Sequence, residues 1–372
     1  MDPNSSEKPP LSLRERLFKT WFPPAAAIGG MAMLVAAVFR QRPAARTVVA
    51  PPGGPAPAVP APGAQAATAP AMASPLLQVA RASSARPTAG PLARQYRLER
   101  VFGEAASAAA FHLSLNGVAL DSSDRLHTLG DGEIRVFAPD GSVARRWKVA
   151  ETAESLAVGP DGRVYVGGSG RVDVYSPRGD RIGGFAFGDK ASPAAVSAVK
   201  IYRDEILVAD ASARIIRRFD AAGRQLGVIG DRGATKTFML PNGKLDLDVD
   251  AAGVVRATDT GRHQVTAWQI DGTPVGRFGK FGMSDPADFV GCCNPVNLAS
   301  TRDGMVVTGE KMVARVKVFT AAGVLMAVIG PEHFDPMCTQ IHLAADAKGR
   351  VYAADPVRRR IQVFAPEAGG AR

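Results

Sequence analysis

A strand-turn-strand unit recurs six times along this chain and leaves few folds open to it. The final copy, IHLAADAKGRVYAADPVRRRIQVFAPEAG from Ile341, reads as strand, turn, strand, loop, strand and turn. Each copy has short runs of β-branched, aromatic or alternating residues separated by glycine-containing turns. The second-turn glycines are spaced by 38 to 51 residues, at Gly141, Gly179, Gly223, Gly272, Gly323 and Gly369. That period is typical of propeller blades, so the sequence predicts an all-β, six-bladed β-propeller.

A short segment outside the repeats predicts how the ring closes. Most copies end on a strand closed by glycine, as in LGVIG at 226–230, whereas the last copy lacks that strand. A matching fragment, RLERVFG at 97–103, stands alone before the first copy. We expect this fragment to supply the outer strand of the last blade, because pairing the two ends leaves no open sheet edge.

Three copies carry a family resemblance. LVADASARIIRRF, RATDTGRHQVTAW and YAADPVRRRIQVF are similar to the core of the NHL repeat, and the match covers about residues 97–369. The resemblance implies an NHL-type propeller, a fold that hosts many functions. Asp210, Asp259 and Asp355 occupy the aspartate position of the repeat, where we expect them to accept turn hydrogen bonds. The fifth copy departs, with Gly-Glu-Lys at 309–311.

The N-terminal part of the chain predicts a membrane anchor and a tether. Residues 25–39 form a charge-free run that follows Trp21 and ends at Arg40. With its aromatic flank the run approaches the roughly 20 residues that span a bilayer, so we expect a transmembrane helix at 21–42. Arginines stand where signal peptidase needs small residues, which predicts that the helix is not cleaved. Residues 43–92, rich in Pro and Ala, are predicted to be a disordered linker.

These segments define four predicted regions: a cytoplasmic segment at 1–20, the anchor at 21–42, the linker at 43–92 and the propeller at 93–372. The arrangement predicts a single-pass protein of the cell inner membrane, with its propeller in the periplasm or outside the cell. The net charge of +10 is concentrated before residue 101, where 12 basic and 4 acidic residues occur, and residues 101–372 are nearly balanced. A balanced folded part argues against a nucleic-acid partner, which requires a basic face.

One position of the repeat predicts a binding site at the mouth of the central channel. Seven residues before the first turn, every copy has a small or polar residue at the start of its inner strand: Gly117, Ser155, Ser197, Asp246, Asn297 and His342. The starts of the inner strands crowd one end of the channel, where propeller ligands commonly bind. A solvated channel lining is the alternative, and Asp246, Asn297 and His342 are the strongest candidate ligand-binding residues.

Three cysteines, Cys292, Cys293 and Cys338, precede the fifth and sixth inner strands. FVGCCNPVNLA at 289–299 resembles a bacterial, membrane-anchored subgroup of NHL proteins with a GCCNP motif. An oxidising compartment favours a disulfide from Cys338 to Cys292 or Cys293. The alternatives are unpaired buried thiols and a thiol-based redox or metal site, in which His342 and Glu310 could complete a set of ligands for Zn or Cu.

Three functions remain open at this point. The first is a protein- or glycan-binding scaffold without catalytic activity, and the second is the redox or metal protein. The third is a metal-dependent lactonase or lyase. The lyases that this propeller resembles bind zinc through histidines just before the apolar pair of the inner strand, where this chain has Leu245, Val296 and Ile341. The lactonases that it resembles use a Glu, an Asn and an Asp to bind calcium. This chain has Asp246 and Asn297, but the other carboxylate is not evident. No cofactor is required by the pattern.

Overall fold

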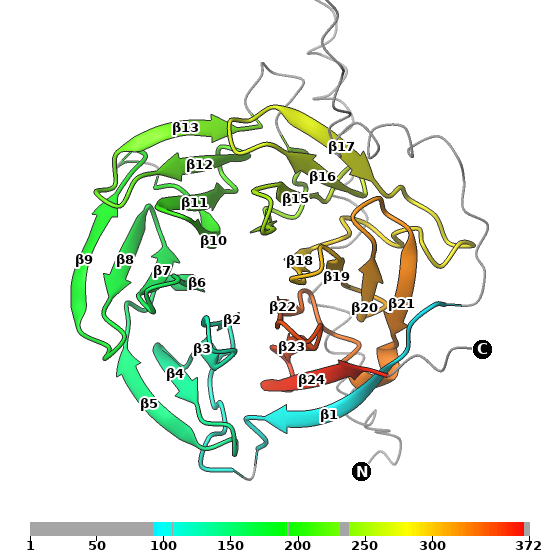
Figure 1. Ribbon diagram of the computed structural model, residues 1–372, viewed down its shortest axis with the longest axis horizontal. Helices are drawn as coiled ribbons and strands as arrows, with labels where there is room; N and C mark the ends of the chain where they lie inside the picture. The colour runs from blue at the N-terminus through cyan, green and yellow to red at the C-terminus, as the bar shows by residue number, and fades with distance from the viewer. Residues whose placement is uncertain (1–91, 106, 190, 192, 231–237, 368–372) are drawn as a thin grey trace, which may run out of the picture. The chain divides into compact units, whose positions relative to one another are not determined.

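Six four-stranded antiparallel sheets form a closed ring in the computed structural model of the chain (Figure 1). The structure describes residues 92–367 except 106, 190, 192 and 231–237. The predicted anchor and nearly all of the predicted linker lie outside these residues. Within the described part of the chain, no helix is both long and apolar enough to cross a bilayer.

Each blade runs from an inner strand at the channel to an outer strand at the rim. The first three blades are β2 (Gly117–Leu120), β3 (Leu126–Gly130), β4 (Glu133–Phe137) and β5 (Val143–Lys148); β6 (Ala153–Val158), β7 (Val164–Gly168), β8 (Arg171–Tyr175) and β9 (Arg181–Ala186); and β10 (Val196–Tyr202), β11 (Glu205–Asp210), β12 (Ile215–Phe219) and β13 (Gln225–Ile229). The fourth and fifth are β14 (Leu247–Val249), β15 (Val255–Asp259), β16 (Gln264–Trp268) and β17 (Pro274–Phe278), and β18 (Asn297–Ser300), β19 (Val306–Glu310), β20 (Arg315–Phe319) and β21 (Leu325–Ile329).

The sixth blade closes the ring as the sequence predicts. It consists of β22 (His342–Ala345), β23 (Val351–Asp355), β24 (Arg360–Pro366) and, on the outside, β1 (Tyr96–Phe102) from the start of the propeller. The register runs from Tyr96 opposite Pro366 to Phe102 opposite Ile361. The first and last segments of the domain therefore share one sheet, which confirms the predicted closure.

The core lies between neighbouring blades, because each sheet buries both faces of its middle strands. Every residue of β3, β7, β15, β19 and β23 is buried. The outer strands alternate or are largely exposed, as in β5 and β17. This layered burial is the pattern expected for sheets stacked side by side around an axis.

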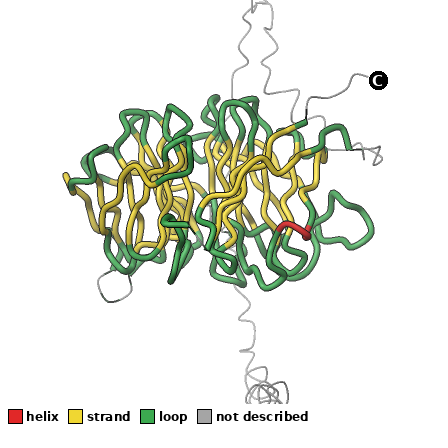
Figure 2. The backbone as a smooth tube through the Cα atoms, turned by 90° about the horizontal axis from the view of Figure 1, so that it is seen from below, coloured by secondary structure: helices red, strands yellow, loops and turns green. Residues whose placement is uncertain are grey.

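The antiparallel topology gives the ring two different faces, visible edge-on in Figure 2 as loops above and below the strands. One face carries the first and third hairpin turns of every blade, and we call it the hairpin face. The opposite face carries the middle hairpin of every blade and the connections from each outer strand to the next inner strand. We call it the connection face, and its loops include the short 3-10 helix η3 (Pro331–His333).

Candidate functional site

A cavity of about 230 Å³ lies at the mouth of the channel on the connection face. Four of the predicted channel residues line it: Ser197, Asp246, Asn297 and His342. Blades 1 and 2 contribute the neighbouring positions Asn116 and Glu154, and Lys244 and Gln340 complete the polar wall. The starts of inner strands from separate repeats thus come together at one place.

Asp246 and Asn297 link neighbouring inner strands. Asp246 Oδ2 accepts hydrogen bonds from Asn297 Nδ2 at 3.1 Å and from the Leu298 amide at 3.0 Å. Asn297 Oδ1 in turn accepts the Ile341 amide at 3.0 Å, and Ser197 Oγ donates to the Leu245 carbonyl at 2.5 Å. These bonds join blades 3 to 6 in sequence. Both side chains therefore have a structural role at the cavity wall.

The carboxyl group of Asp246 sits in an environment that disfavours its charge. Burial raises the pKa of Asp246, and the nearby Lys200 ammonium and the Leu298 amide oppose this rise only in part. Lys200 itself lies 3.4 Å from Asp248, which also accepts the Ser300 amide at 2.6 Å. A carboxyl group with a raised pKa beside a cavity can donate a hydrogen bond to a ligand when it is protonated and accept one when it is ionised.

His342 is the wall residue with unused hydrogen-bonding capacity. Its Nε2 is buried and has no hydrogen-bond partner. Burial, and to a smaller extent the charge of Lys244, lowers the pKa of His342 to about 4. The ring is thus neutral at pH 7, and its buried Nε2 keeps unused hydrogen-bonding capacity in a residue of the cavity wall.

Ser155 differs from the other predicted channel residues, because it does not line the cavity. Its side chain is buried against β7, where a Cβ at Gly167 would lie 2.6 Å from Ser155 Oγ. The hydroxyl has no hydrogen-bond partner. The equivalent position in the first blade is Gly117, which has no side chain, and Asn116 next to it reaches the cavity instead. The aligned position of the repeats therefore lies at the cavity, but only four of its six residues line the cavity wall.

All three cysteines are free thiols in the structure, so the predicted disulfide of Cys338 is not present. Cys338 Sγ donates to Asp355 Oδ1 at 3.1 Å in the core of the sixth blade. Burial and the adjacent Asp355 raise the pKa of Cys338 to about 12. Cys292 and Cys293 lie in the connection between β17 and β18, and their sulfur atoms are 3.3 Å apart.

The described residues contain no group of three or more His, Cys, Asp and Glu side chains able to hold a metal ion. Glu310, a candidate ligand, is fully buried and lies 3.0 Å from the equally buried Lys317 ammonium. It also pairs with Arg315. Glu310 ends β19 opposite Arg315, as Asp355 ends β23 opposite Arg360. The fifth repeat therefore keeps a carboxylate at the aspartate position of the others.

The predicted structural role of the repeat aspartates agrees with their contacts. Asp210 Oδ1 accepts Ser212 Oγ at 2.6 Å and the Ala213 amide at 3.0 Å. Asp355 Oδ1 accepts the Val357 amide at 2.9 Å and the Arg358 amide at 2.8 Å. Asp259 Oδ1 accepts the Met239 amide at 2.9 Å. Each carboxylate thus orders a loop of the connection face.

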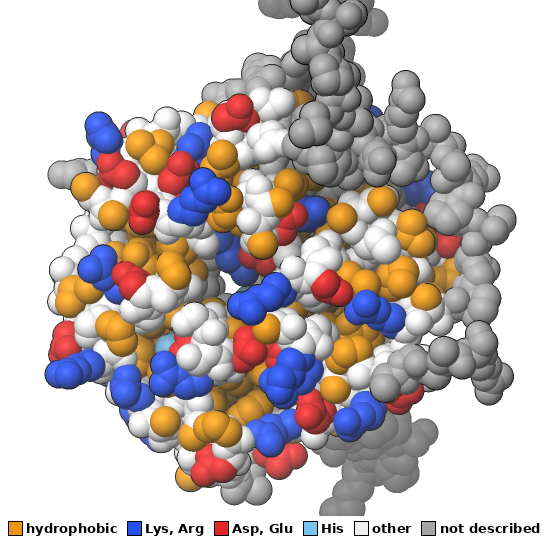
Figure 3. Space-filling view, in the orientation of Figure 1, with side chains coloured by type: hydrophobic (Ala, Val, Ile, Leu, Met, Phe, Trp, Pro, Cys, Tyr) orange, Lys and Arg blue, Asp and Glu red, His pale blue; other side chains and the backbone are white. Residues whose placement is uncertain are grey.

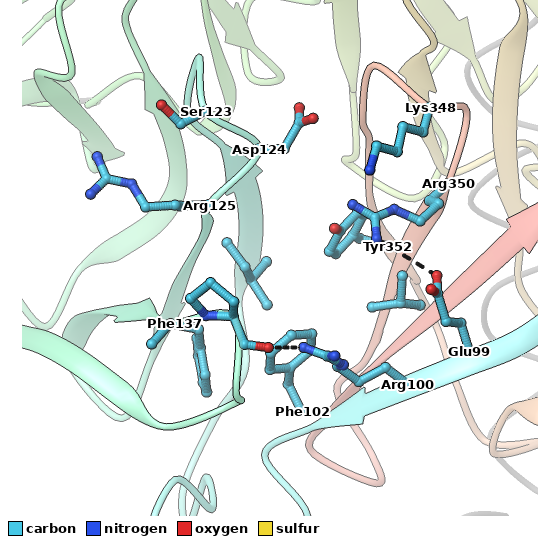
Figure 4. A pocket seen from close by; sticks show the side chains of 14 residues that line it. Glu99, Arg100, Phe102, Ser123, Asp124, Arg125, Phe137, Lys348, Arg350 and Tyr352 are labelled. Atoms are coloured by element: carbon cyan, nitrogen blue, oxygen red, sulfur yellow. Dashed lines mark hydrogen bonds and ion pairs between the residues drawn. The ribbon is translucent and has the colours of Figure 1, made fainter.

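A second cavity, of about 310 Å³, lies at the seam between the first and sixth blades on the hairpin face. Figure 4 shows cationic side chains around it, including Arg125, Lys348 and Arg350, above the aromatic rings of Phe102 and Phe137. Arg350 approaches Glu99 at 3.7 Å. Sequence analysis missed this groove, because it forms only where the two ends of the ring meet.

Charge is mixed on the face of the ring that Figure 3 draws. On the face drawn in Figure 3, basic and acidic side chains alternate around the blades, and neither sign dominates a sector. Many are paired, such as Arg224 with Asp220 and Arg163 with Asp161. A surface of this kind supplies no broad single-sign field to steer a charged polymer.

Exposed apolar side chains are distributed unevenly between the faces, a feature that sequence analysis did not detect. Twelve large apolar side chains of the described residues are exposed, and eight of them lie in loops of the connection face. These eight are Leu113, Met239, Phe281, Met283, Met312, Val313, Met337 and Val357. Three of the others, Leu98, Ile182 and Leu226, lie on outer strands, and the fourth is Leu92.

Contacts between loops bring two members of this apolar set, Phe281 and Met312, near one another. The His263 ring packs edge-on against Phe281 with 5.3 Å between centroids, and His263 Nε2 is 2.9 Å from the Gly291 carbonyl oxygen. A Cβ at Gly291 would lie 3.1 Å from Met312 Sδ. Blades 4 and 5 therefore present Phe281 and Met312 on the same part of the connection face.

Comparison with known proteins supports no function. No protein-family model and no curated protein matches the chain. Similar solved structures include a chain of the mitotic checkpoint complex (13% identity, 76% of this chain and 96% of that one, TM-score 0.49). Others are a protein of unknown function from Bacteroides caccae (12%, 60% and 84%, 0.47) and Myxococcus xanthus glutaminyl cyclase (11%, 74% and 98%, 0.43). Membership of the NHL family and of its GCCNP subgroup stays a prediction.

Proposed function

We propose that this chain is a binding scaffold, a β-propeller that holds a protein partner on its connection face. The observation that carries the proposal is the set of eight exposed apolar side chains in the loops of that face. Removal of apolar surface from water favours association by roughly 25 cal/mol per Å². Four of the eight are methionines, whose flexible thioethers adapt to the shape of a partner.

The expected partner is a protein segment with apolar side chains, rather than a strongly charged one. Charged groups beside the exposed loops include ion pairs within the face: Lys280 lies 3.1 Å from Asp288, and Arg358 Nε lies 3.9 Å from a carboxylate oxygen of Asp335 and of Asp355. Pairing leaves little net charge to attract an ionic partner. We therefore expect binding to weaken only slightly with rising salt, in contrast to binding driven by charge.

The point at which the chain enters the propeller favours this use of the connection face. Tyr96, at the start of β1, donates to the carbonyl of Gly349 in a turn of the hairpin face at 3.2 Å. The segment before β1 thus joins the ring on the side that we do not propose for binding. We further propose that residues 21–42 anchor the chain in the inner membrane and that the propeller lies in the periplasm, on the sequence evidence alone.

A pair of matched substitutions tests the scaffold. In the full chain, Met283→Asp and Met337→Asp place a charge at side chains that are 81% and 75% exposed on the connection face. The control, Leu226→Asp, alters an exposed leucine on outer strand β13. A partner identified by cross-linking in cells should be lost from both connection-face variants and retained by the control. Equal retention by all three variants would contradict the proposal.

A second candidate function, ligand binding in the channel cavity, is favoured by the unpaired Nε2 of His342. The carboxyl, amide and imidazole groups of the wall suit a glycan or another polyol. A panel of saccharides added to the full chain tests this role by thermal unfolding. A saccharide that binds in the cavity should raise the Tm of the natural protein but should cause no shift in the Tm of His342→Leu. Equal ligand-induced shifts in the two proteins would exclude the cavity as the binding site.

A further inference from the structure

The adjacent thiols Cys292 and Cys293 differ in exposure but are in contact. Cys292 is exposed to solvent, and Cys293 is only 6% exposed. Their sulfur atoms lie 3.3 Å apart, with one thiol hydrogen-bonded to the other. An accessible thiol next to a sheltered one is the arrangement needed for a two-step exchange, in which the first reacts with an external disulfide and the second resolves the adduct.

The loop that carries the two thiols is fixed on both sides. Before them, the Gly291 carbonyl oxygen lies 2.9 Å from His263 Nε2 of blade 4. After them, Asn294 Nδ2 donates to Val290 O at 2.6 Å and to Lys311 O at 3.1 Å, and Asn294 Oδ1 accepts the Lys311 amide at 2.9 Å. Hydrogen bonds to neighbouring loops therefore fix the backbone on both sides of the two cysteines.

The third cysteine is occupied elsewhere. Cys338 is 2% exposed, and its thiol donates to Asp355 in the sixth blade. A thiol is a nucleophile only as its thiolate, and burial next to a carboxylate raises the pKa of Cys338 to about 12. Burial and the neighbouring Cys292 also raise the pKa of Cys293, so geometry is what distinguishes the two buried thiols: Cys293 is in contact with an exposed thiol, whereas Cys338 donates to the Asp355 carboxylate.

We propose that Cys292 and Cys293 form a reversible disulfide with each other by exchange with a low-molecular-weight disulfide such as glutathione disulfide. The Cys292 thiolate attacks one sulfur of that disulfide, forms a mixed disulfide and releases one thiolate. The Cys293 thiolate then attacks the Cys292 sulfur, closes the protein disulfide and displaces the second thiolate. Two protein thiols are oxidised, one external disulfide is reduced, and the two protons pass to the two glutathione thiols that leave.

The resulting bond is expected to be easily reduced. Consecutive Cα atoms lie about 3.8 Å apart, whereas disulfide-bonded residues usually have Cα atoms about 4.4–6.8 Å apart. A bond closed across this shorter separation is strained, and strained, exposed disulfides have more oxidising potentials than structural ones. The site is therefore suited to switching between the two states, independently of the partner-binding role proposed above.

Differential alkylation of the full chain tests the proposal. The protein is equilibrated with glutathione buffers of increasing oxidised fraction, free thiols are blocked with iodoacetamide, and the peptides are mapped by mass spectrometry. We expect Cys292 and Cys293 to become protected together in a single peptide that is lighter by two hydrogens, while Cys338 stays a thiol. A small excess of dithiothreitol should restore both thiols. Detection of Cys338 linked to Cys292 or Cys293 would overturn the proposal.

Two single substitutions keep the test decisive. Cys293→Ser removes the resolving thiol, so glutathione should accumulate on Cys292. Cys338→Ser should behave as the natural protein does, because Cys338 takes no part. If the natural protein also stops at the glutathione adduct of Cys292, Cys293 does not resolve it, and the proposal is wrong.

Discussion

The two faces of the ring differ in the side chains that their loops expose. On the hairpin face, carboxylates cap the turns: Asp121, Asp161, Asp250 and Asp346 each accept backbone amides of their own turn. On the connection face, apolar side chains stand exposed, and the wall of the channel cavity leaves His342 Nε2 without a partner. Carboxylates cap loops on both faces, so the exposed apolar side chains are what separates the connection face, as the side available for binding, from the hairpin face.

The difference between the faces concerns exposed side chains, and the buried carboxylate of Glu310 is an exception on the connection face. Glu310 ends on the connection face but is fully buried with Lys317. Glu310→Ala leaves a buried ammonium unpaired, which should lower the free energy of unfolding by about 3–5 kcal/mol. Glu332→Ala, at an exposed carboxylate of the same face, should change it by less than about 0.5 kcal/mol. Chemical denaturation measures both, and equal small effects would contradict a buried ion pair.

His342 gives the next largest expected effect, through pH. Its pKa is lowered to about 4 in the folded chain, from 6.5 in the reference state. Between these values the unfolded chain binds more protons, so stability should fall as pH drops from about 6.5 towards 4, by up to about 3 kcal/mol. In His342→Gln that part of the pH dependence should disappear. An unchanged slope between these pH values would show that the ring is not buried in its neutral form.

Loss of a cap on the hairpin face should affect stability but not binding. Asp346 Oδ1 accepts the Lys348 and Arg350 amides, both at 2.9 Å, and the aspartate is 2% exposed. Asp346→Ala should lower the free energy of unfolding by about 2 kcal/mol, because the turn loses its acceptor and Arg350 loses a partner. Capture of the partner at a temperature well below unfolding should be unchanged. Weakened capture by the folded variant would place binding on the hairpin face.

The smallest effect on stability is expected where the effect on binding is largest. Met283 and Met337 are exposed, so Met283→Asp and Met337→Asp should each change the free energy of unfolding by less than about 0.5 kcal/mol. Thermal and chemical unfolding of the two variants measure this. A large destabilisation would mean that the side chains pack within the fold and are not a free surface.

The sequence predicts the fold in detail because its periodic features report local structure. Turn glycines mark the outer hairpins of the first five blades, and the fragment at 97–103 pairs with β24 as predicted. The channel position also gathers Ser197, Asp246, Asn297 and His342 around one cavity. Both placements share a cause, because each follows from the alignment of one repeat with the next, and the ligand-binding role of the channel residues stays a prediction.

The features that sequence analysis missed depend on tertiary contacts that the period of the repeat does not report. Single methionines in irregular loops carry no periodic pattern, and only the closed ring places Met283, Met312 and Met337 on one face. The hydrogen bond from Cys338 to Asp355 joins two loops of the sixth blade, so spacing alone did not separate Cys338 from Cys292 and Cys293. The side chain of Ser155 is likewise buried against Gly167, which leaves room for it because glycine has no side chain.

Site-specific photo-crosslinking on the two faces tests whether a protein partner binds the connection face. A photoreactive amino acid replaces Met283 on the connection face or Ala222, an exposed residue in a turn of the hairpin face, in the full chain. The account predicts that a defined protein is captured from position 283 and not from position 222. Capture of the same protein from position 222 alone, or with equal yield from both positions, would contradict it.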